Sequence, residues 1–244
     1  MKICLCAAKN KSCDTEYNIS QIKLFIEKTK DEKPDLLLFG EAFLQGFDSL
    51  CFEYKKDILT AISIHSSEIS KIGNLAQKNK IAIGFGFIEN NHGAIFSTYL
   101  IIGKTGKIID KYQRVSQGWR IKNTCADYRE GKDFHTFQLE NKKFAVMICG
   151  DLWEDNLLSK IISMEAEIFL WPVFCAYTAE EWEASAKAEY SARTAILNQT
   201  VLFVDSIVKI NDDKYSGSGA VIWRHGNILK ELPAGQSGFL TYEI

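Results

Sequence analysis

The sequence lacks the features of a secreted or membrane-spanning protein. None of its apolar runs approaches the length needed to cross a bilayer. The run at Met1 to Ala8 is too short for a secretory signal peptide. Seven cysteines, an odd number without any Cys-x-x-Cys spacing, exclude a disulfide framework in which every thiol is paired. These absences predict a cytoplasmic protein whose thiols stay reduced and which has no membrane partner.

Charge of one sign is also scarce, and so are the usual signs of a cofactor or metal. The formal net charge is -2, and the basic run from Lys28 to Lys33 is interrupted by acids, so no nucleic-acid partner is expected. The four histidines are scattered, which argues against a zinc site. Gly84-Phe85-Gly86 lacks the third glycine of a dinucleotide-binding turn. We therefore expect neither a metal nor a cofactor.

Apolar periodicity predicts a single domain, 1–244, that is rich in strands with helices between them. Unbroken or alternating apolar runs predict strands over 1–8, 36–39, 81–88, 94–102, 134–139, 144–148, 167–171, 201–207, 219–223, 228–232 and 239–242. Helical spacing predicts helices over 18–28, 66–80, 156–164 and 179–197. The polar segment 110–133 has no clear period and is predicted to be a long loop that walls a site. This order predicts two sheets covered by helices.

Two reactive side chains stand directly after predicted buried strands. Glu41 follows the strand over 36–39, and Cys149 follows the strand over 144–148. Layered α/β folds place their sites at such strand ends. Each residue alone also has an ordinary structural explanation, because a glutamate there often caps or is solvated and a cysteine is often a small core residue.

The surroundings of these two residues carry more information than the residues themselves. The first strand ends in Gly40-Glu41 with Gly46-Phe47 beyond it, and Phe-Ala-Val-Met-Ile-Cys-Gly-Asp occupies 144–151. Gly217-Ser218-Gly219 and Gly226-Asn227 precede the last strands. In order and spacing these segments resemble the nitrilase superfamily of carbon-nitrogen hydrolases over nearly the whole chain.

The resemblance implies a fold, a reaction and an assembly. The fold is an α/β four-layer α-β-β-α sandwich, and the assembly is a homodimer or higher homo-oligomer. The substrate is a small linear amide or a related carbon-nitrogen compound. Cys149 attacks the carbon, Glu41 accepts the thiol proton and passes it to the leaving nitrogen, and the backbone N–H of Gly150 helps to bind the oxyanion.

One position departs from the family pattern. The family's lysine motif appears here as Tyr112-Gln113-Arg114-Val115-Ser116, so arginine stands where the catalytic lysine is expected. A guanidinium can stabilise an oxyanion, but it is bulkier than an ammonium and does not give up its proton. Arg114 therefore either serves the reaction with altered geometry or marks its loss. Lys111 and Lys122 are out of register with the motif.

The remaining predicted site residues would shape a substrate pocket. Glu130 is the nearest candidate for the second glutamate found in many amidases of the family, although a structural role fits it better. Asp151 is expected to hold the nucleophile loop by accepting backbone N–H groups. The aromatic candidates for the pocket wall, for each of which core packing is the alternative, are Phe47, Trp119, Trp153 and Phe174.

Two rival interpretations stay open at this point. The replacement at Arg114 also suits a catalytically silent relative that acts as a binding or assembly module. An ordinary doubly wound α/β protein with an unrelated site is the other, and a single parallel sheet would reveal it. No Gly-x-Ser-x-Gly elbow occurs, and no histidine lies beside Cys149 in the sequence, which disfavours a Ser-His or Cys-His site.

Overall fold

Two six-stranded mixed sheets form the centre of the protein. The computed structural model describes residues 1–209 and 215–244. The first sheet has the order β15-β1-β3-β4-β5-β6, and the second has the order β14-β13-β10-β9-β8-β7. Both repeat one pairing pattern, in which three neighbouring parallel strands are flanked by antiparallel ones. The parallel trios are β1, β3, β4 and β8, β9, β10.

The strand bounds are as follows. The first sheet contains β1 (Lys2–Ala7), β3 (Leu36–Leu38), β4 (Ala82–Asn91), β5 (Ala94–Ile102), β6 (Ile108–Gln113) and β15 (Gly238–Glu243). The second contains β7 (Thr136–Leu139), β8 (Lys142–Val146), β9 (Ile168–Val173), β10 (Thr200–Asp205), β13 (Ala220–Arg224) and β14 (Asn227–Leu232). A small third sheet joins β2 (Lys9–Asn10), β11 (Ile207–Lys209) and β12 (Tyr215–Ser216).

The apolar runs become strands because both faces of the central strands are buried. In β1, Ile3 and Leu5 point into the core between the two sheets, whereas Cys4 and Cys6 point into the core under the helices. Successive side chains of a strand alternate between faces, so a strand covered on both sides must be apolar throughout. Each fully buried aliphatic side chain of this kind contributes about 1.5–3 kcal/mol.

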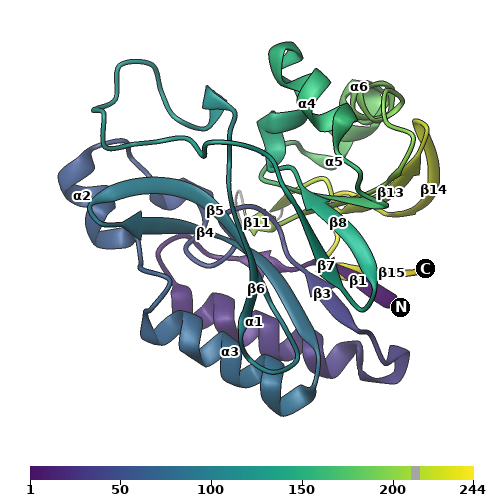
Figure 1. Ribbon diagram of the computed structural model, residues 1–244, viewed down its shortest axis with the longest axis horizontal. Helices are drawn as coiled ribbons and strands as arrows, with labels where there is room; N and C mark the ends of the chain where they lie inside the picture. The colour runs from purple at the N-terminus through teal and green to yellow at the C-terminus, as the bar shows by residue number, and fades with distance from the viewer. Residues whose placement is uncertain (210–214) are drawn as a thin grey trace.

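Helices cover the outer face of each sheet, as Figure 1 shows. α1 (Thr15–Lys28) and α3 (Ser67–Asn79) pack on the first sheet, with Ile22 and Ile72 in its outer core. α4 (Leu158–Ser163), α5 (Ala179–Glu181) and α6 (Lys187–Thr194) cover the second sheet. The predicted four-layer α-β-β-α sandwich is thus confirmed, and two mixed sheets exclude the single doubly wound sheet.

Several parts of the chain differ from the sequence prediction. The predicted strand over 201–207 is divided between β10 in the second sheet and β11 in the third. The segment predicted as a loop over 110–133 begins inside β6, an edge strand that pairs with β5; its polar composition concealed it because an edge strand is partly exposed. The predicted helix over 179–197 is interrupted by a π-helical turn at Trp182–Ala186 and ends at Thr194. Helix α2 (Tyr54–Thr60) was not predicted, because Asp57 is its only buried residue and no apolar stripe marks it.

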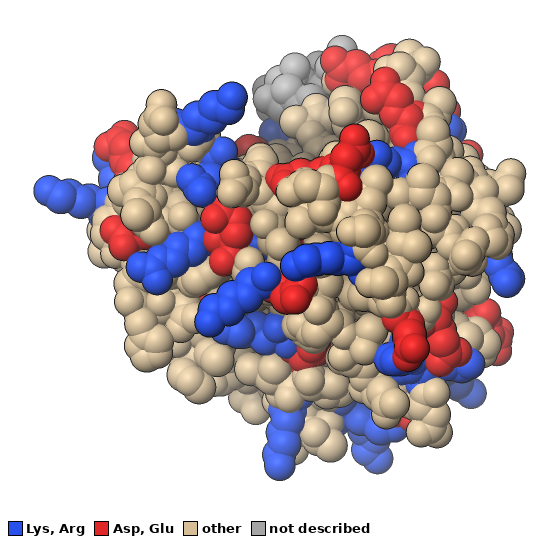
Figure 2. Space-filling view, turned by 45° about the horizontal axis from the view of Figure 1, so that its top comes forward, with Lys and Arg blue, Asp and Glu red and all other residues tan. Residues whose placement is uncertain are grey.

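The face of the protein seen in Figure 2 carries charges of both signs. Figure 2 shows Lys and Arg side chains interspersed with Asp and Glu on the face in view, without a continuous basic area there. Within 1–209 and 215–244, no helix is long and apolar enough to cross a bilayer.

Candidate active site

Segments from both sheets converge on one cavity of about 330 Å³, called here the Cys149 cavity. Glu41 follows β3, Arg114 follows β6, and Cys149 and Phe174 follow β8 and β9. The carboxyl ends of parallel strands lie at one edge of a sheet, so stacking the sheets brings these side chains together. The lining residues are Glu41, Phe47, Phe52, Arg114, Gly118, Trp119, Arg120, Ile121, Cys149 and Phe174.

Glu41 is held by contacts from three directions. Its backbone N–H donates to the carbonyl of Val173 (3.1 Å), which ties the end of β3 to the end of β9 across the two sheets. Its Oε1 accepts hydrogen bonds from Ser97 Oγ (2.9 Å) and Arg114 Nη1 (3.1 Å). The residue is 1% exposed, and these hydrogen bonds offset the cost of burying its polar side chain. Oε2 has no hydrogen-bond partner among the described residues and remains for chemistry in the cavity.

Arg114 is a buried cation placed between the acid and the nucleophile turn. Its side chain is 4% exposed, and its Nε donates to Ser116 Oγ (2.7 Å). Burial alone would lower the pKa of Arg114, but attraction to Glu41, Cys149 and Asp151 outweighs it and raises that pKa. The guanidinium is therefore a fixed positive charge. It can donate hydrogen bonds but cannot serve as a general acid.

Gly150 lies against this guanidinium. A Cβ added to Gly150 would stand 2.1 Å from Arg114 Nη2, so a side chain at this position would displace the arginine. Only a glycine allows such a close approach of backbone and guanidinium. Gly150, the predicted oxyanion donor, thus lies against Arg114, but it is not among the residues that line the Cys149 cavity.

Cys149 occupies a backbone conformation that is uncommon for a residue with a side chain. Its φ is +41°, in the left-handed region, where the chain turns from β8 into the 3₁₀ turn Cys149–Leu152. Backbone strain of this kind costs about 1–3 kcal/mol and is concentrated at functional sites. The turn is held by Trp171, whose Nε1 donates to the Cys149 carbonyl (2.9 Å). The Cys149 Sγ lies 4.0 Å from the Phe174 carbonyl.

Asp151 holds the nucleophile turn to the segment that carries Arg114. Its Oδ1 accepts from the backbone N–H groups of Val115 (3.1 Å) and Ser116 (2.7 Å). Its Oδ2 accepts from Ile148 N–H (2.8 Å) and from Tyr112 Oη (2.6 Å). Burial raises the pKa of Asp151, although Arg114 and these donors oppose that rise. The carboxylate thus joins two loops, in agreement with the structural role expected from the sequence.

Aromatic side chains form the walls of the cavity. The rings of Phe47 and Phe174 stack with centroids 5.2 Å apart. Phe52, on the segment before α2, was missed because no strand or helix pattern marks that segment. Asp57 positions it by accepting from the Phe52 N–H (2.7 Å) and from Tyr128 Oη (2.7 Å). Tyr128 in turn packs against Trp119, so one buried carboxylate links two walls of the cavity.

Three of the predicted pocket residues, Gly150, Trp153 and Glu130, are not among the residues that line the Cys149 cavity. Trp153 is 37% exposed and packs against Trp171 and Tyr190 in the helical layer, because the 3₁₀ turn after Cys149 directs it away from the cavity. Glu130 lines a separate cavity of about 480 Å³. It also accepts a hydrogen bond from Arg120 Nε (2.5 Å), so it reaches the Cys149 cavity only through Arg120.

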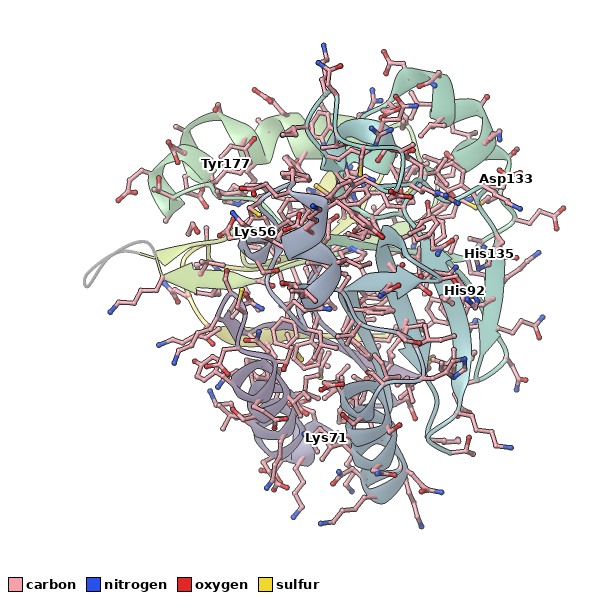
Figure 3. All side chains as sticks on the ribbon, turned by 90° about the vertical axis from the view of Figure 1, so that its left-hand side faces the viewer. Lys56, Lys71, His92, Asp133, His135 and Tyr177 are labelled. Atoms are coloured by element: carbon pink, nitrogen blue, oxygen red, sulfur yellow. The ribbon has the colours of Figure 1, made fainter. Side chains whose placement is uncertain are left out.

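The other lysines and acids near the site are engaged in pairs of their own. Lys111 forms an ion pair with Glu89 (2.7 Å), so it does not replace Arg114. His135, labelled in Figure 3, contacts Asp110 (2.8 Å), and this contact raises the pKa of His135.

Across the described ranges, no group of three or more His, Cys, Asp or Glu side chains is arranged to hold a metal ion.

The chain matches a known protein family. The family model described as Carbon-nitrogen hydrolase matches residues 2–244. The hydrolase in the agr operon of Staphylococcus aureus is 25% identical over 90% of this chain and 82% of its own length. The omega-amidase NIT3 of Saccharomyces cerevisiae is 24% identical over 97% of this chain and 84% of its own length. Nitrilase 3 of Arabidopsis thaliana is 22% identical over 70% of this chain, which covers 53% of that protein.

Solved structures agree on the fold. An amidase from Nesterenkonia sp. superposes with a TM-score of 0.79 at 17% identity, covering 100% of this chain and 90% of that one. A mutant of the amidase from Nesterenkonia sp. AN1, with a TM-score of 0.78 at 16% identity, covers 100% of this chain and 93% of its own. That structure is described as showing Michael addition of acrylamide at the active site cysteine.

Proposed function

Because the chain belongs to the carbon-nitrogen hydrolase family, we propose that it hydrolyses a carbon-nitrogen bond of a small linear amide through a thioester on Cys149. One observation carries the proposal: Glu41, Arg114 and Cys149, from three different strand ends, line a single cavity. The amidase and omega-amidase among the similar proteins favour an amide over other carbon-nitrogen compounds.

The first half of the reaction forms the acyl-enzyme. Glu41 accepts the proton of the Cys149 thiol, and the sulfur attacks the amide carbon. The carbonyl oxygen gains negative charge, and we assign its stabilisation to Arg114 Nη2 and the Gly150 N–H. Glu41 then passes its proton to the nitrogen, the C–N bond breaks, and the amine leaves.

The second half returns the enzyme to its starting state. Glu41 removes a proton from water, which attacks the thioester carbon, and the same donors stabilise the second oxyanion. The C–S bond breaks, the Cys149 sulfur is reprotonated, and the acid departs. Because Arg114 Nη1 and Nε are engaged by Glu41 and Ser116, Nη2 is the donor that remains for the oxyanion.

The cavity limits the size and character of the substrate. A volume of about 330 Å³ is at the small end of ligand sites, and four of the ten lining residues are aromatic. Phe47, Phe52 and Phe174 suit an apolar acyl chain. Arg120 at the same cavity is already paired with Glu130, so a substrate group must share that cation.

An ammonia-release screen tests the proposal directly. The parent protein is compared with Cys149→Ala and Arg114→Lys over ω-amides, N-carbamoyl compounds and nitriles, with Cys125→Ala, an exposed thiol outside the cavity, as the matched control. We expect Cys149→Ala to lose all measurable turnover and Cys125→Ala to retain it. Full activity of Cys149→Ala on any substrate would show that the nucleophile is wrongly assigned.

Alkylation distinguishes the hydrolase from a silent binding module. An activated Cys149 should react with iodoacetamide much faster than the other six thiols, since the thiolate is the reactive form. Peptide mapping after a short exposure gives the rate at each cysteine. Equal labelling of Cys149 and the exposed Cys13 would favour the silent interpretation.

We also propose a homodimer or higher homo-oligomer. Large apolar side chains are exposed near the helices of the second sheet, at Trp153, Ile162 and Ile196, and an interface there would cover them. Light scattering coupled to size exclusion should give a mass near twice the 27.6 kDa of one chain, or a higher multiple. A mass of one chain at micromolar concentration would refute this proposal.

A further inference from the structure

A second cysteine, Cys175, lies just beyond the end of the strand next to the one that Cys149 follows. β8 and β9 are parallel neighbours, with Val146 opposite Leu170, so the register places Cys149 at the level of Val173. Cys175 follows Val173, the last residue of the adjacent strand β9, by two residues. Adjacent strands lie about 4.8 Å apart. The topology therefore brings two thiols together that are separated by 26 positions in the sequence.

Side-chain contacts agree with this placement. The Cys149 Sγ lies 4.0 Å from the carbonyl of Phe174, the residue before Cys175. The Cys175 Sγ lies 2.9 Å from Tyr190 Oη. The Tyr190 ring packs on Trp171, with centroids 5.1 Å apart, and Trp171 holds the Cys149 carbonyl. Both cysteines thus contact one aromatic pair under the floor of the cavity.

The backbone around Cys175 is also held in place. Its N–H donates to Asp205 Oδ1 (3.3 Å), and Asp205 additionally accepts from the N–H groups of Ser206 and Ser218. Tyr177, labelled in Figure 3, lies just beyond, where the chain leads toward α5. Of the five other cysteines, Cys4 and Cys6 lie in the core under α1 and α3, and Cys13, Cys51 and Cys125 are exposed.

We propose that Cys149 and Cys175 form a reversible disulfide when a hydroperoxide oxidises Cys149, which stops the reaction and protects the nucleophile. In the first step the Cys149 sulfur attacks the peroxide: an S–O bond forms, the O–O bond breaks, and the leaving oxygen takes up a proton. Cys149 is oxidised to the sulfenic acid and the hydroperoxide is reduced to an alcohol or water. In the second step the Cys175 sulfur attacks the Cys149 sulfur, an S–S bond forms, the S–O bond breaks, and the departing hydroxide takes the Cys175 proton to give water.

The electrostatics of the pair favour this order of events. The pKa of the Cys175 thiol is raised well above its usual value, first by the interaction with Cys149 and then by burial. Cys175 therefore stays protonated, and unreactive, while Cys149 is reduced. Oxidation of Cys149 to the sulfenic acid creates an electrophilic sulfur beside Cys175, so the Cys175 sulfur has a partner to attack only after Cys149 has been oxidised.

Mass spectrometry of the full-length protein tests the inference. The protein is treated with hydrogen peroxide, blocked with iodoacetamide and digested with trypsin without reduction. Cleavage after Lys143, Lys160 and Lys187 puts Cys149 and Cys175 on separate peptides, 144–160 and 161–187, each with one cysteine. We expect a linked pair of these peptides, two hydrogens lighter than their sum, that dithiothreitol separates. Absence of this pair at peroxide concentrations that oxidise Cys149 would overturn the inference.

A variant tests what the second thiol does. In Cys175→Ser the same peroxide dose should carry Cys149 to sulfinic or sulfonic acid, and dithiothreitol should fail to restore alkylation of Cys149 or amide hydrolysis, whereas the parent and Cys125→Ser recover both. Recovery of Cys175→Ser as complete as that of the parent would refute the role of Cys175. Only the activity readout rests on the proposed function, so a linked pair in a protein that hydrolyses no amide would refute the proposed function and leave the thiol pair standing.

Discussion

Asp151→Asn should destabilise the protein and loosen the loop that carries Arg114. Asparagine keeps the shape and one acceptor oxygen, which can still receive the N–H groups of Val115 and Ser116. Its amide nitrogen, a donor, then faces the Ile148 N–H, which is also a donor, so this N–H loses its hydrogen bond. The Tyr112 hydroxyl can rotate to accept a hydrogen bond from the amide. The opposite orientation of the amide would leave two N–H groups unpaired instead of one.

The magnitude follows from that single unpaired group. A buried donor without a partner costs about 1–3 kcal/mol. Loss of the charge offsets part of this, because burial of the ionised form is the main reason that the pKa of Asp151 is raised. We therefore expect a net loss of about 1–2 kcal/mol in the free energy of unfolding. In a chain of this size that corresponds to a melting temperature lower by about 2–8 °C.

Urea denaturation at pH 7 measures the loss, and Asp155→Asn is the matched control. Asp155 is an exposed aspartate whose ion pair with Arg193 (2.7 Å) should contribute no more than about 1 kcal/mol. Amide hydrogen exchange supplies a local readout, since the N–H groups of Ser116 and Ile148 should exchange faster in Asp151→Asn alone. If Asp151→Asn unfolds at the same urea concentration as the parent and its exchange is unchanged, the carboxylate does not join the two loops.

Two further predictions concern the neighbours of the site. In Gly150→Ala the new Cβ would meet Arg114 Nη2 at 2.1 Å, so kcat should fall by roughly tenfold or more, whereas Gly118→Ala, whose Cβ would lie 3.7 Å from the same nitrogen, should lower kcat much less. Equal effects of the two would contradict the geometry. Burial raises the pKa of Asp205 from 3.8 to about 7. Since the folded state then holds a proton that the unfolded state releases, stability should fall as pH rises from about 4 to 7, by about 4 kcal/mol in all, and change no further above that. Urea midpoints of the parent and Asp205→Asn across this window test the sign, because the asparagine variant should lack this part of the pH dependence.

The sequence alone determined those strands and helices whose burial can be seen in the pattern of neighbouring residues. The runs that became β1, β3 and β8 are apolar because both of their faces are buried, and such runs identify both the strand and the residue where it ends. This placed Glu41 and Cys149 at a sheet edge. The edge strand β6 and the short α2 were not predicted, since partial exposure removes the apolar pattern on which such predictions depend.

Only the tertiary structure decided which strand-end side chains meet. Ser97 donates a hydrogen bond to Glu41, which is 56 positions away in the sequence. Cys175 lies near Cys149 because β8 and β9 are adjacent strands. Glu130 is directed to Arg120, away from the cavity that its place in the sequence had suggested. Period and composition specify the face on which a side chain lies, but contacts between distant loops depend on how the two sheets stack, and no local pattern encodes that stacking.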